Sequence, residues 1–378
     1  IAGLHDMPTQ MRWLSDAAQT VLTYAVKYLF RCAFKQGNIK FFAKDFTGCG
    51  WTLLALGKLG AGELNFSSDV DLIALHDTNN APFDSRDAVQ PFFVKMTRDL
   101  IRILSTKTKD GIGWRVDLRL RPDPGATAVS IDLDAAIGYY ESIARTWERA
   151  AFIRARPIAG DLQLGKNFLD QIQPFIWRKT LDYTVLEDMK TMLRRPPQPK
   201  SWLGYNLKTG KNGIRQIEFF IHVLQLVTGG RDTNLRKRNS LSALHALANA
   251  GWITHEQSEA LGNAYNQLRR VEHRLQMIGD NQTHSLPRSI EDLEKFSHFM
   301  GHSDSAGFCL ELSKLLDSVG RHVAHDLLDP PAEFGDQEKG ITTILIDDYD
   351  TLLNWLIDNG FKRPKIVADT LSGWMAGR

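Results

Sequence analysis

The sequence predicts an α+β protein that is helical over most of its length and carries one small mixed sheet. Two observations lead to this prediction. Between about residues 51 and 130, short apolar runs that end at glycine or proline alternate with a helical period. From residue 133 to residue 328, apolar residues recur almost throughout at helical spacing. We therefore expect a small α+β domain followed by a helical domain.

The chain is expected to begin with a helix and then to enter the sheet. Apolar residues at helical spacing predict an amphipathic helix over residues 13–34. Residues 51–56 are a short, largely apolar run followed by glycine, which predicts a buried strand. Residues 57–62 are rich in glycine and predict a turn, and residues 67–75 predict a second strand. A helix over residues 89–104 follows this strand.

A third strand is predicted over residues 113–120, and a Pro-Asp-Pro-Gly sequence ends it. Strand signals mostly vanish beyond this point, so helices are expected in the rest of the chain. Breaks between them are expected at Pro157, at the proline-rich residues 194–199 and at Gly229-Gly230. A further short helix is predicted over residues 349–359.

These elements divide the chain into four expected regions. They are an N-terminal helical segment over residues 1–50, an α+β domain over residues 51–160, a helical bundle domain over residues 161–330 and a tail over residues 331–378. The chain begins at Ile1 rather than at methionine, which suggests an excerpt of a longer protein.

The composition is that of an ordinary folded protein and excludes several classes. Lys plus Arg number 46 and Asp plus Glu number 44, so the net charge of +2 lacks the basic excess of a generic nucleic-acid coat. The longest apolar stretches have about half of the ~20 residues needed to span a bilayer, which argues against a membrane partner. The 3 cysteines form no C-x-x-C pair, so we predict no zinc or disulfide framework and expect reduced thiols in the cytoplasm.

Two aspartates, Asp69 and Asp71, lie two residues apart on the predicted second strand. Side chains alternate along a strand, so both carboxylates face the same side, with Cα atoms roughly 6–7 Å apart. In an apolar strand such a pair repels and loses hydration unless a cation lies between its members. Carboxylate oxygens favour Mg²⁺ over Zn²⁺, so the pair predicts a magnesium site. The alternative is a strand end with two solvated aspartates.

A third acid, Asp117, lies on the predicted third strand between two arginines. Arg115, Asp117 and Arg119 would alternate onto one face, and Arg121 extends the alternation. Acids that hold a metal beside arginines that hold oxyanions are typical of a site for phosphates. The alternative is a ladder of cross-strand ion pairs.

The glycine-rich segment over residues 57–62 matches neither of the common phosphate-binding loops. The segment is informative because of its position, since it precedes the Asp-x-Asp pair by about ten residues. Its glycines would let the backbone approach a triphosphate. A glycine turn, then Asp-x-Asp on the next strand and then a distant third acid resemble the nucleotidyltransferase superfamily related to DNA polymerase β.

The resemblance becomes closer over longer stretches. The sequence Leu-Gly-Lys-Leu-Gly-Ala-Gly-Glu-Leu-Asn-Phe-Ser-Ser-Asp-Val-Asp-Leu-Ile at residues 56–73 is similar to the signature of the glutamine synthetase adenylyltransferase family, also called glutamate–ammonia-ligase adenylyltransferases. Further similar stretches follow in the family's order at residues 115–122, 145–149, 213–219 and 225–231. Together they span roughly residues 10–330.

The resemblance implies one of two related activities. Members of the family carry two similar nucleotidyltransferase halves, of which one attaches AMP from ATP to a tyrosine of glutamine synthetase. The other half removes that AMP by phosphorolysis and gives ADP. The signature occurs once in this chain, and Asn65-Phe66 within it is typical of the N-terminal, AMP-removing half, where the attaching half more often has Gly-Tyr. Residues 331–378 would then begin a linker to a second half.

The resemblance also implies site residues and partners. Asp69, Asp71 and Asp117 would hold Mg²⁺ and serve catalysis. The residues expected to bind nucleotide or phosphate oxygens are Gly57, Lys58, Gly60, Ser67, Ser68, Arg119, Arg121 and Arg215. The implied partners are adenylylated glutamine synthetase, the PII signal protein, a nucleotide and phosphate, with no nucleic acid and no membrane.

The sequence departs from the family pattern at Gln216, where Glu is usual, and at Asn212, where Gly is usual. If a glutamate at position 216 orients a catalytic arginine, the change weakens that role for Arg215. Three alternatives stay open. They are the adenylylating half, another member of the superfamily that acts on RNA ends or a small molecule, and a non-catalytic module that binds glutamine synthetase or PII.

Overall fold

The structure is a computed structural model of the chain. It describes most of the residues, namely 5–39, 46–178, 201–324, Leu353 and Lys365. The chain forms two compact units, residues 1–323 and residues 324–378. The helices and strands with described bounds lie in the first unit, and α13 ends one residue beyond it.

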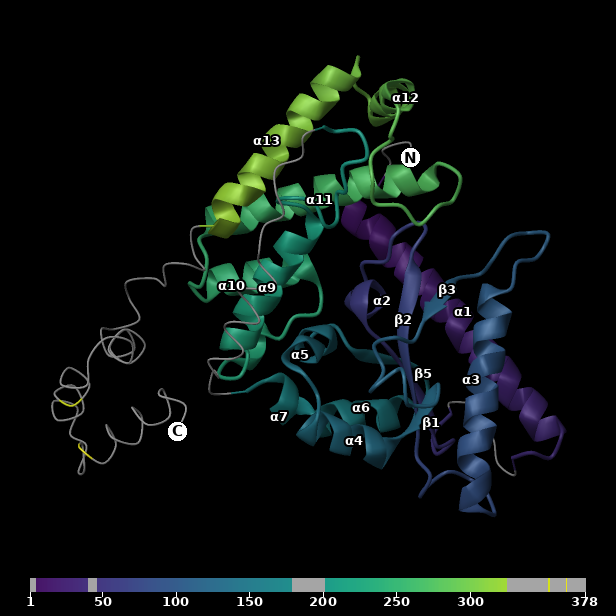
Figure 1. Cartoon of the computed structure of the whole chain (residues 1–378). Helices are drawn as coiled ribbons and strands as arrows, with labels where there is room; N and C mark the ends of the chain where they lie inside the picture. Colours follow the sequence, from purple (N-terminus) through teal and green to yellow (C-terminus); the bar gives the residue numbers. More distant parts are fainter. Residues whose placement is uncertain (1–4, 40–45, 179–200, 325–352, 354–364, 366–378) are drawn as a thin grey trace. The chain divides into compact units, whose positions relative to one another are not determined.

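The elements follow one another along the chain as labelled in Figure 1. They are α1 (Met7–Lys35), β1 (Trp51–Ala55), α2 (Gly57–Ala61), β2 (Asp69–His76), η1 (Arg86–Ala88), α3 (Val89–Ser105), β3 (Arg115–Asp117), β4 (Ser130–Asp132), α4 (Leu133–Ser142), α5 (Thr146–Phe152), β5 (Arg156–Gly160), α6 (Leu162–Gln171), α7 (Gln173–Ile176), α9 (Ile214–Thr228), η2 (Thr233–Leu235), α10 (Ser240–Asn249), α11 (His255–Met277), α12 (Ile290–Met300) and α13 (Ser305–Ala324).

The strands form one five-stranded mixed sheet in the order β3-β2-β1-β5, and β4 also pairs with β2. β1 runs antiparallel to β2 and β5, whereas β2 runs parallel to β3 and β4. The described elements after β5 are helices (Figure 1). The predicted class, an α+β fold that is mostly helical, is therefore confirmed.

β1 is buried along its whole length because helices cover both of its faces. Leu53 belongs to a core that includes Phe30 of α1 and Phe93 of α3. Its neighbour Leu54 points the other way, into a core that includes Phe168 of α6. Each such buried side chain contributes roughly 1.5–3 kcal/mol. Because alternate residues of the strand feed two cores, the strand has no solvent-facing position.

The first helix and the helix after β2 are confirmed, with a longer first helix than predicted. α1 begins at Met7, because the side chain of Asp6 accepts a hydrogen bond from the backbone N–H of Thr9 at 2.8 Å. Pro8 in the first turn suits this start, since its fixed backbone angle is helical. α3 spans Val89–Ser105, close to the predicted range.

The third strand is much shorter than predicted, because β3 ends at Asp117. The backbone N–H of Arg119 donates to the side chain of Asp117 at 2.8 Å, which turns the chain away from the sheet. The prediction that Arg119 and Arg121 continue the alternation of the strand was therefore wrong.

Two strands escaped the sequence analysis. β4 has three residues, too few to show a period. β5 contains Pro157, which the sequence analysis took as a break between helices. It lies at the end of the order β3-β2-β1-β5 and its register shifts opposite Leu53 and Leu54, so the missing N–H of the proline is tolerated there.

The glycine-rich segment is a short helix rather than the predicted turn. α2 spans Gly57–Ala61 and ends at Gly62, which has a φ of 73°. Gly60 lies close to backbone, since an added Cβ would overlap the carbonyl oxygen of Arg154. The segment therefore packs tightly between β1 and the chain before β5.

The later helices follow the predicted breaks where the structure describes them. α9 ends at Thr228, directly before Gly229-Gly230, as predicted. The break at residues 194–199 and the helix over residues 349–359, apart from Leu353, lie outside the described residues. Within the described part of the chain, every helix is too short or too polar to cross a lipid bilayer.

Candidate active site

The two aspartates of the Asp-x-Asp pair lie at the start of β2. Asp69 and Asp71 are half-buried and alternate with the fully buried Val70, as the strand period requires. Burial, then the charges of Asp69 and Asp117, raise the pKa of Asp71 to about 6. Burial and neighbouring negative charges both favour the protonated form of a carboxyl group, which is the direction of this shift.

β3 brings the third acid to the same place. The parallel register pairs Asp71 with Asp117 and Asp69 with Arg115. Asp117 turns toward Arg119, whose Nε lies 2.8 Å from its Oδ2 atom. Burial raises the pKa of Asp117, but the hydrogen bonds from Arg119 outweigh it and leave the pKa below its usual value.

The donor set suits Mg²⁺, because three carboxylates from adjacent strand positions supply hard oxygen ligands. In the described ranges, however, no three His, Cys, Asp or Glu side chains are already gathered as a metal-ligand set. The predicted convergence of the acids is thus present in the strand register, while the carboxylate of Asp117 is engaged by Arg119.

Gly57 is fitted against the acid pair. Its φ is 51°, and an added Cβ would overlap the Oδ2 atom of Asp71. The backbone N–H of Leu56 donates to the carbonyl oxygen of Asp71 at 2.9 Å. A side chain at position 57 would therefore displace the carboxylate that the site depends on.

Lys58 points to the helical part of the molecule. Its Nζ atom lies 3.6 Å from Oε1 of the fully buried Glu272 on α11. Burial lowers the pKa of Lys58, while the charge of Glu272 acts in the opposite direction. Lys58 and Lys208 each act to lower the pKa of Asp71, so both ammonium groups lie near the acid pair.

The two predicted serines are buried. Ser67 is fully engaged, since its hydroxyl donates to the carbonyl oxygen of Asp280 at 3.2 Å and accepts from Arg115. Its backbone N–H donates to Gln276 at 3.2 Å. Ser68 precedes Asp69 directly. These contacts give Ser67 a role in joining β2 and β3 to the segment after α11.

Three further predicted residues lie apart from the acids or are engaged elsewhere. The N–H of Gly60 donates to Leu56 within α2. The guanidinium of Arg121 donates to the carbonyl oxygens of its own loop, including Leu118 at 2.9 Å. The side chain of Arg215 is exposed and lies over the ring of Phe219 on α9, 4.9 Å from its centroid.

The two departures from the family pattern contact each other. The side chain of Gln216 accepts the backbone N–H of Asn212 at 2.9 Å. Asn212 has a φ of 60°, a conformation that favours glycine. Gln216 is thus bonded to the loop before α9 rather than to Arg215.

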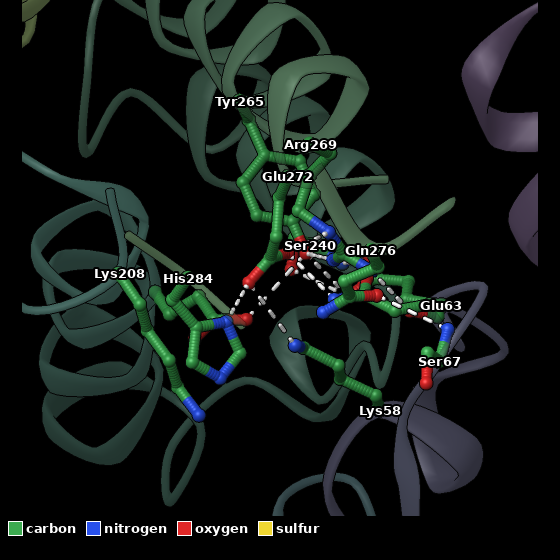
Figure 2. Close-up of polar contacts among 12 residues, drawn as sticks. Lys58, Glu63, Ser67, Lys208, Ser240, Tyr265, Arg269, Glu272, Gln276 and His284 are labelled. Atoms are coloured by element: carbon green, nitrogen blue, oxygen red, sulfur yellow. Dashed lines mark hydrogen bonds and ion pairs between the residues drawn. The ribbon is translucent and has the colours of Figure 1, made fainter. Parts of the chain in front are cut away.

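A buried polar network beside the site was not predicted (Figure 2). Glu63 accepts from the N–H of Ser240 at 2.6 Å and from the hydroxyl of Tyr265 at 2.9 Å. Asn65 donates to Glu272 at 2.7 Å and accepts from Arg269. The network joins the signature segment after α2 to α10 and α11.

One sequence signal could have revealed the network. Four polar residues recur along α11 at the spacing of one helix face, namely Tyr265, Arg269, Glu272 and Gln276. A polar stripe flanked by apolar positions on a long helix indicates a buried polar contact rather than a solvated face.

Two known protein families are similar to parts of this chain. Residues 1–171 match the family model described as glutamate-ammonia ligase adenylyltransferase. Over these residues the chain is similar to that family. Residues 186–326 match a second model, described as GlnD PII-uridylyltransferase.

Curated relatives of the family extend the similarity over nearly the whole chain. A protein of Xanthobacter autotrophicus is 41% identical over 397 residues, which cover 100% of this chain and 39% of the relative. A protein of Rhizobium meliloti is 43% identical over 376 residues, which cover 97% of this chain and 38% of the relative. Both are named bifunctional glutamine synthetase adenylyltransferase/adenylyl-removing enzyme. The chain thus spans under half the length of these relatives.

Proposed function

We propose that this chain is a Mg²⁺-dependent nucleotidyltransferase that removes AMP from an adenylylated tyrosine of glutamine synthetase by phosphorolysis, with ADP as the product. The observation that carries the proposal is the register that places Asp117 beside Asp71, against Gly57. The names of the relatives support the substrate and both possible directions.

The acids would hold Mg²⁺ at the phosphate of the AMP group. Asp69, Asp71 and Asp117 are the candidate ligands, and the ion would offset the negative charge that collects on the phosphate oxygens during an in-line displacement. The positive charges of Lys58 and Lys208 both act on Asp71, and they would attract the incoming phosphate.

The direction of the reaction rests on the signature segment. Asn65 takes part in the network with Glu272 and Arg269, and a Gly-Tyr pair in its place would remove these bonds. The attaching reaction, with ATP as donor and pyrophosphate as product, is the alternative. We assign residues 51–160 as the catalytic domain and residues 161–330 as a helical bundle domain.

The partners follow from the same assignment. Adenylylated glutamine synthetase is the proposed macromolecular substrate, and the match of residues 186–326 to a PII-uridylyltransferase model supports PII as a regulatory partner. We also propose a cytoplasmic location, where the chain would meet glutamine synthetase and PII.

The test is incubation of the chain with adenylylated glutamine synthetase, Mg²⁺ and inorganic phosphate, followed by measurement of ADP. A parallel reaction contains unmodified synthetase and ATP. ADP in the first reaction supports removal, whereas AMP-modified synthetase in the second supports attachment. The Asp69→Asn/Asp71→Asn variant is expected to lose activity, and a normal rate in that variant would show that the metal assignment is wrong.

The melting temperature of the same variant tests the metal site independently of activity. Mg²⁺ is expected to raise the melting temperature of the unaltered chain, because it relieves the repulsion among the acids. It should leave that of the Asp69→Asn/Asp71→Asn variant unchanged. An equal shift in both proteins would place the ion elsewhere.

A further inference from the structure

The helical part of the molecule presents a carboxylate–histidine pair to the segment that holds Lys58. Nδ1 of His284 lies 2.6 Å from Oε1 of Glu272. Glu272 is fully buried. Burial opposes its ionisation, but Lys58, the hydrogen bond from His284 and Arg269 hold its pKa well below the usual value. An ionised Glu272 accepts, so Nδ1 of His284 carries a proton.

The second ring nitrogen of His284 is free to react. Its Nε2 atom has no partner among the described residues, and the side chain is 20% exposed. The backbone around it is fixed, because its carbonyl oxygen accepts the N–H of Leu207 at 2.8 Å and Ser285 forms a bridge with Asn206. The ring is therefore held by one nitrogen and open at the other.

The pair lies next to the candidate active site. The Oε1 atom that accepts from His284 also lies 3.6 Å from Nζ of Lys58, the residue after Gly57. Figure 2 shows Glu272 between Lys58 and His284, with Lys208 projecting from the neighbouring loop. Lys208 in turn acts on Asp71. His284 is thus linked by two short contacts to Lys58, whose charge acts on Asp71.

We propose that His284 is the general acid of the transfer reaction and that Glu272 is its positioning residue. The inference rests on the function proposed above. A phosphate oxygen forms the new bond to the phosphorus of the AMP group, and the bond from that phosphorus to the tyrosyl oxygen breaks. The tyrosyl oxygen keeps the electron pair and takes the proton from Nε2 of His284, and the ring regains a proton from water.

The chemistry explains why such a group is useful. A tyrosine phenol has an ordinary pKa of about 10, so its anion is a poor leaving group near neutral pH. A carboxylate that accepts from one ring nitrogen stabilises the imidazolium and fixes which nitrogen faces the substrate. General acids of this kind contribute roughly 10²–10⁴-fold in rate.

The test compares two leaving groups. The unaltered chain and the His284→Gln variant act on adenylylated glutamine synthetase that carries either tyrosine or 3,5-difluorotyrosine at the target position. The fluorinated phenol is more acidic and leaves without help. We expect His284→Gln to lower kcat by about 100-fold or more on the tyrosyl substrate and by less than about 10-fold on the fluorinated one. KM for the synthetase should be unchanged.

The matched control is His255→Gln. His255 is exposed at the start of α11, and its replacement should leave both rates unchanged. A His284→Ala variant adds a second reading, because free imidazole should restore part of its lost rate on the tyrosyl substrate. Thermal melts of all variants check that they fold.

Each outcome is decisive. Equal losses on both substrates, or no rescue by imidazole, would assign His284 a merely structural role and overturn the inference. An unchanged rate in His284→Gln would overturn it while leaving the proposed function intact. If the unaltered chain produces no ADP, both proposals fail together.

Discussion

At the scale of single residues, the proposed site has no room for a side chain at position 57. Its backbone has a positive φ, and the space where a Cβ would stand is occupied by the carboxylate of Asp71. Gly62, at the end of the same short helix, also has a positive φ but faces open space. Replacing Gly62 therefore costs only the strained backbone conformation, whereas replacing Gly57 adds a steric overlap with Asp71.

The first prediction uses this contrast. Gly57→Ala is expected to cost about 2 kcal/mol of folding stability and to abolish activity, because the methyl group displaces Asp71. Gly62→Ala should cost about 1 kcal/mol and keep most of the activity. Urea denaturation and ADP release measure the two effects. Equal loss of activity in both variants would show that the overlap with Asp71 has no role.

A second prediction concerns His273, a buried histidine on α11. Burial, then the charge of Arg269, lower its pKa to about 3. The folded chain keeps the ring neutral, whereas the unfolded chain binds a proton below its ordinary pKa of about 6.5. Stability should therefore fall as the pH drops below about 6.5, by up to ~1.4 kcal/mol per pH unit from this residue.

Unfolding free energies at pH 7.5 and pH 5.5 test the second prediction. His273→Gln should reduce the difference between the two values, and His255→Gln should not, because that ring is exposed. A pH dependence that is the same in His273→Gln and in the unaltered chain would contradict it.

At the scale of elements, α11 differs from an ordinary amphipathic helix because a row of its polar side chains is buried. Tyr265, Arg269 and Glu272 turn toward the segment after α2 rather than toward solvent. Glu63 accepts the backbone N–H and the hydroxyl of Ser240 and the hydroxyl of Tyr265, so its carboxylate is bonded to both α10 and α11. The elements are held by charge and hydrogen bonds as well as by apolar contact.

The third prediction follows from this pairing. Glu63→Gln places an amide opposite donors and removes the charge that faces Arg154, 3.7 Å away. We expect a loss of about 3 kcal/mol in unfolding free energy. Glu256→Gln, on the exposed first turn of α11, should change the unfolding free energy by less than about 0.5 kcal/mol. Chemical denaturation monitored by tryptophan fluorescence measures both, and similar values for the two would refute the expectation.

At the scale of the whole molecule, the sheet and the later helices of residues 1–323 are joined by buried polar contacts. The sheet supplies the acids and Gly57, while the segments after residue 200 supply Lys208, His284 and the partners of Glu63. If residues 51–160 stood alone, Glu63 and Asn65 would lose these partners, and the surface that α10 and α11 cover would be exposed to water.

The fourth prediction tests this dependence. A truncated chain of residues 5–178 is expected to be poorly soluble and inactive, because Glu63 and Asn65 lose the side chains of α10 and α11. Size-exclusion chromatography and ADP release from adenylylated glutamine synthetase are the measurements. A monomeric, active product would mean that the helical part contributes nothing to the site.

The elements predicted well are those whose signal is local. A run such as residues 51–56 is recognised because nearly every position is apolar, and α9 ends where Gly229-Gly230 lowers the helical propensity. β5 was missed because Pro157 argues against a strand, and only its place at the end of the strand order makes the proline acceptable.

The sequence by itself determined the α+β class, the strands β1 and β2 and the spacing of Asp69 and Asp71, because periodicity and a two-residue interval are local properties of the chain. Tertiary structure alone decided which residues stand beside those acids. The pairing of Asp71 with Asp117, the turn of Arg119 onto Asp117 and the contact of Lys58 with Glu272 join residues far apart in the chain or depend on where a strand ends. Such contacts are set by packing and by the need to pair buried charges, and neither is encoded at a fixed spacing.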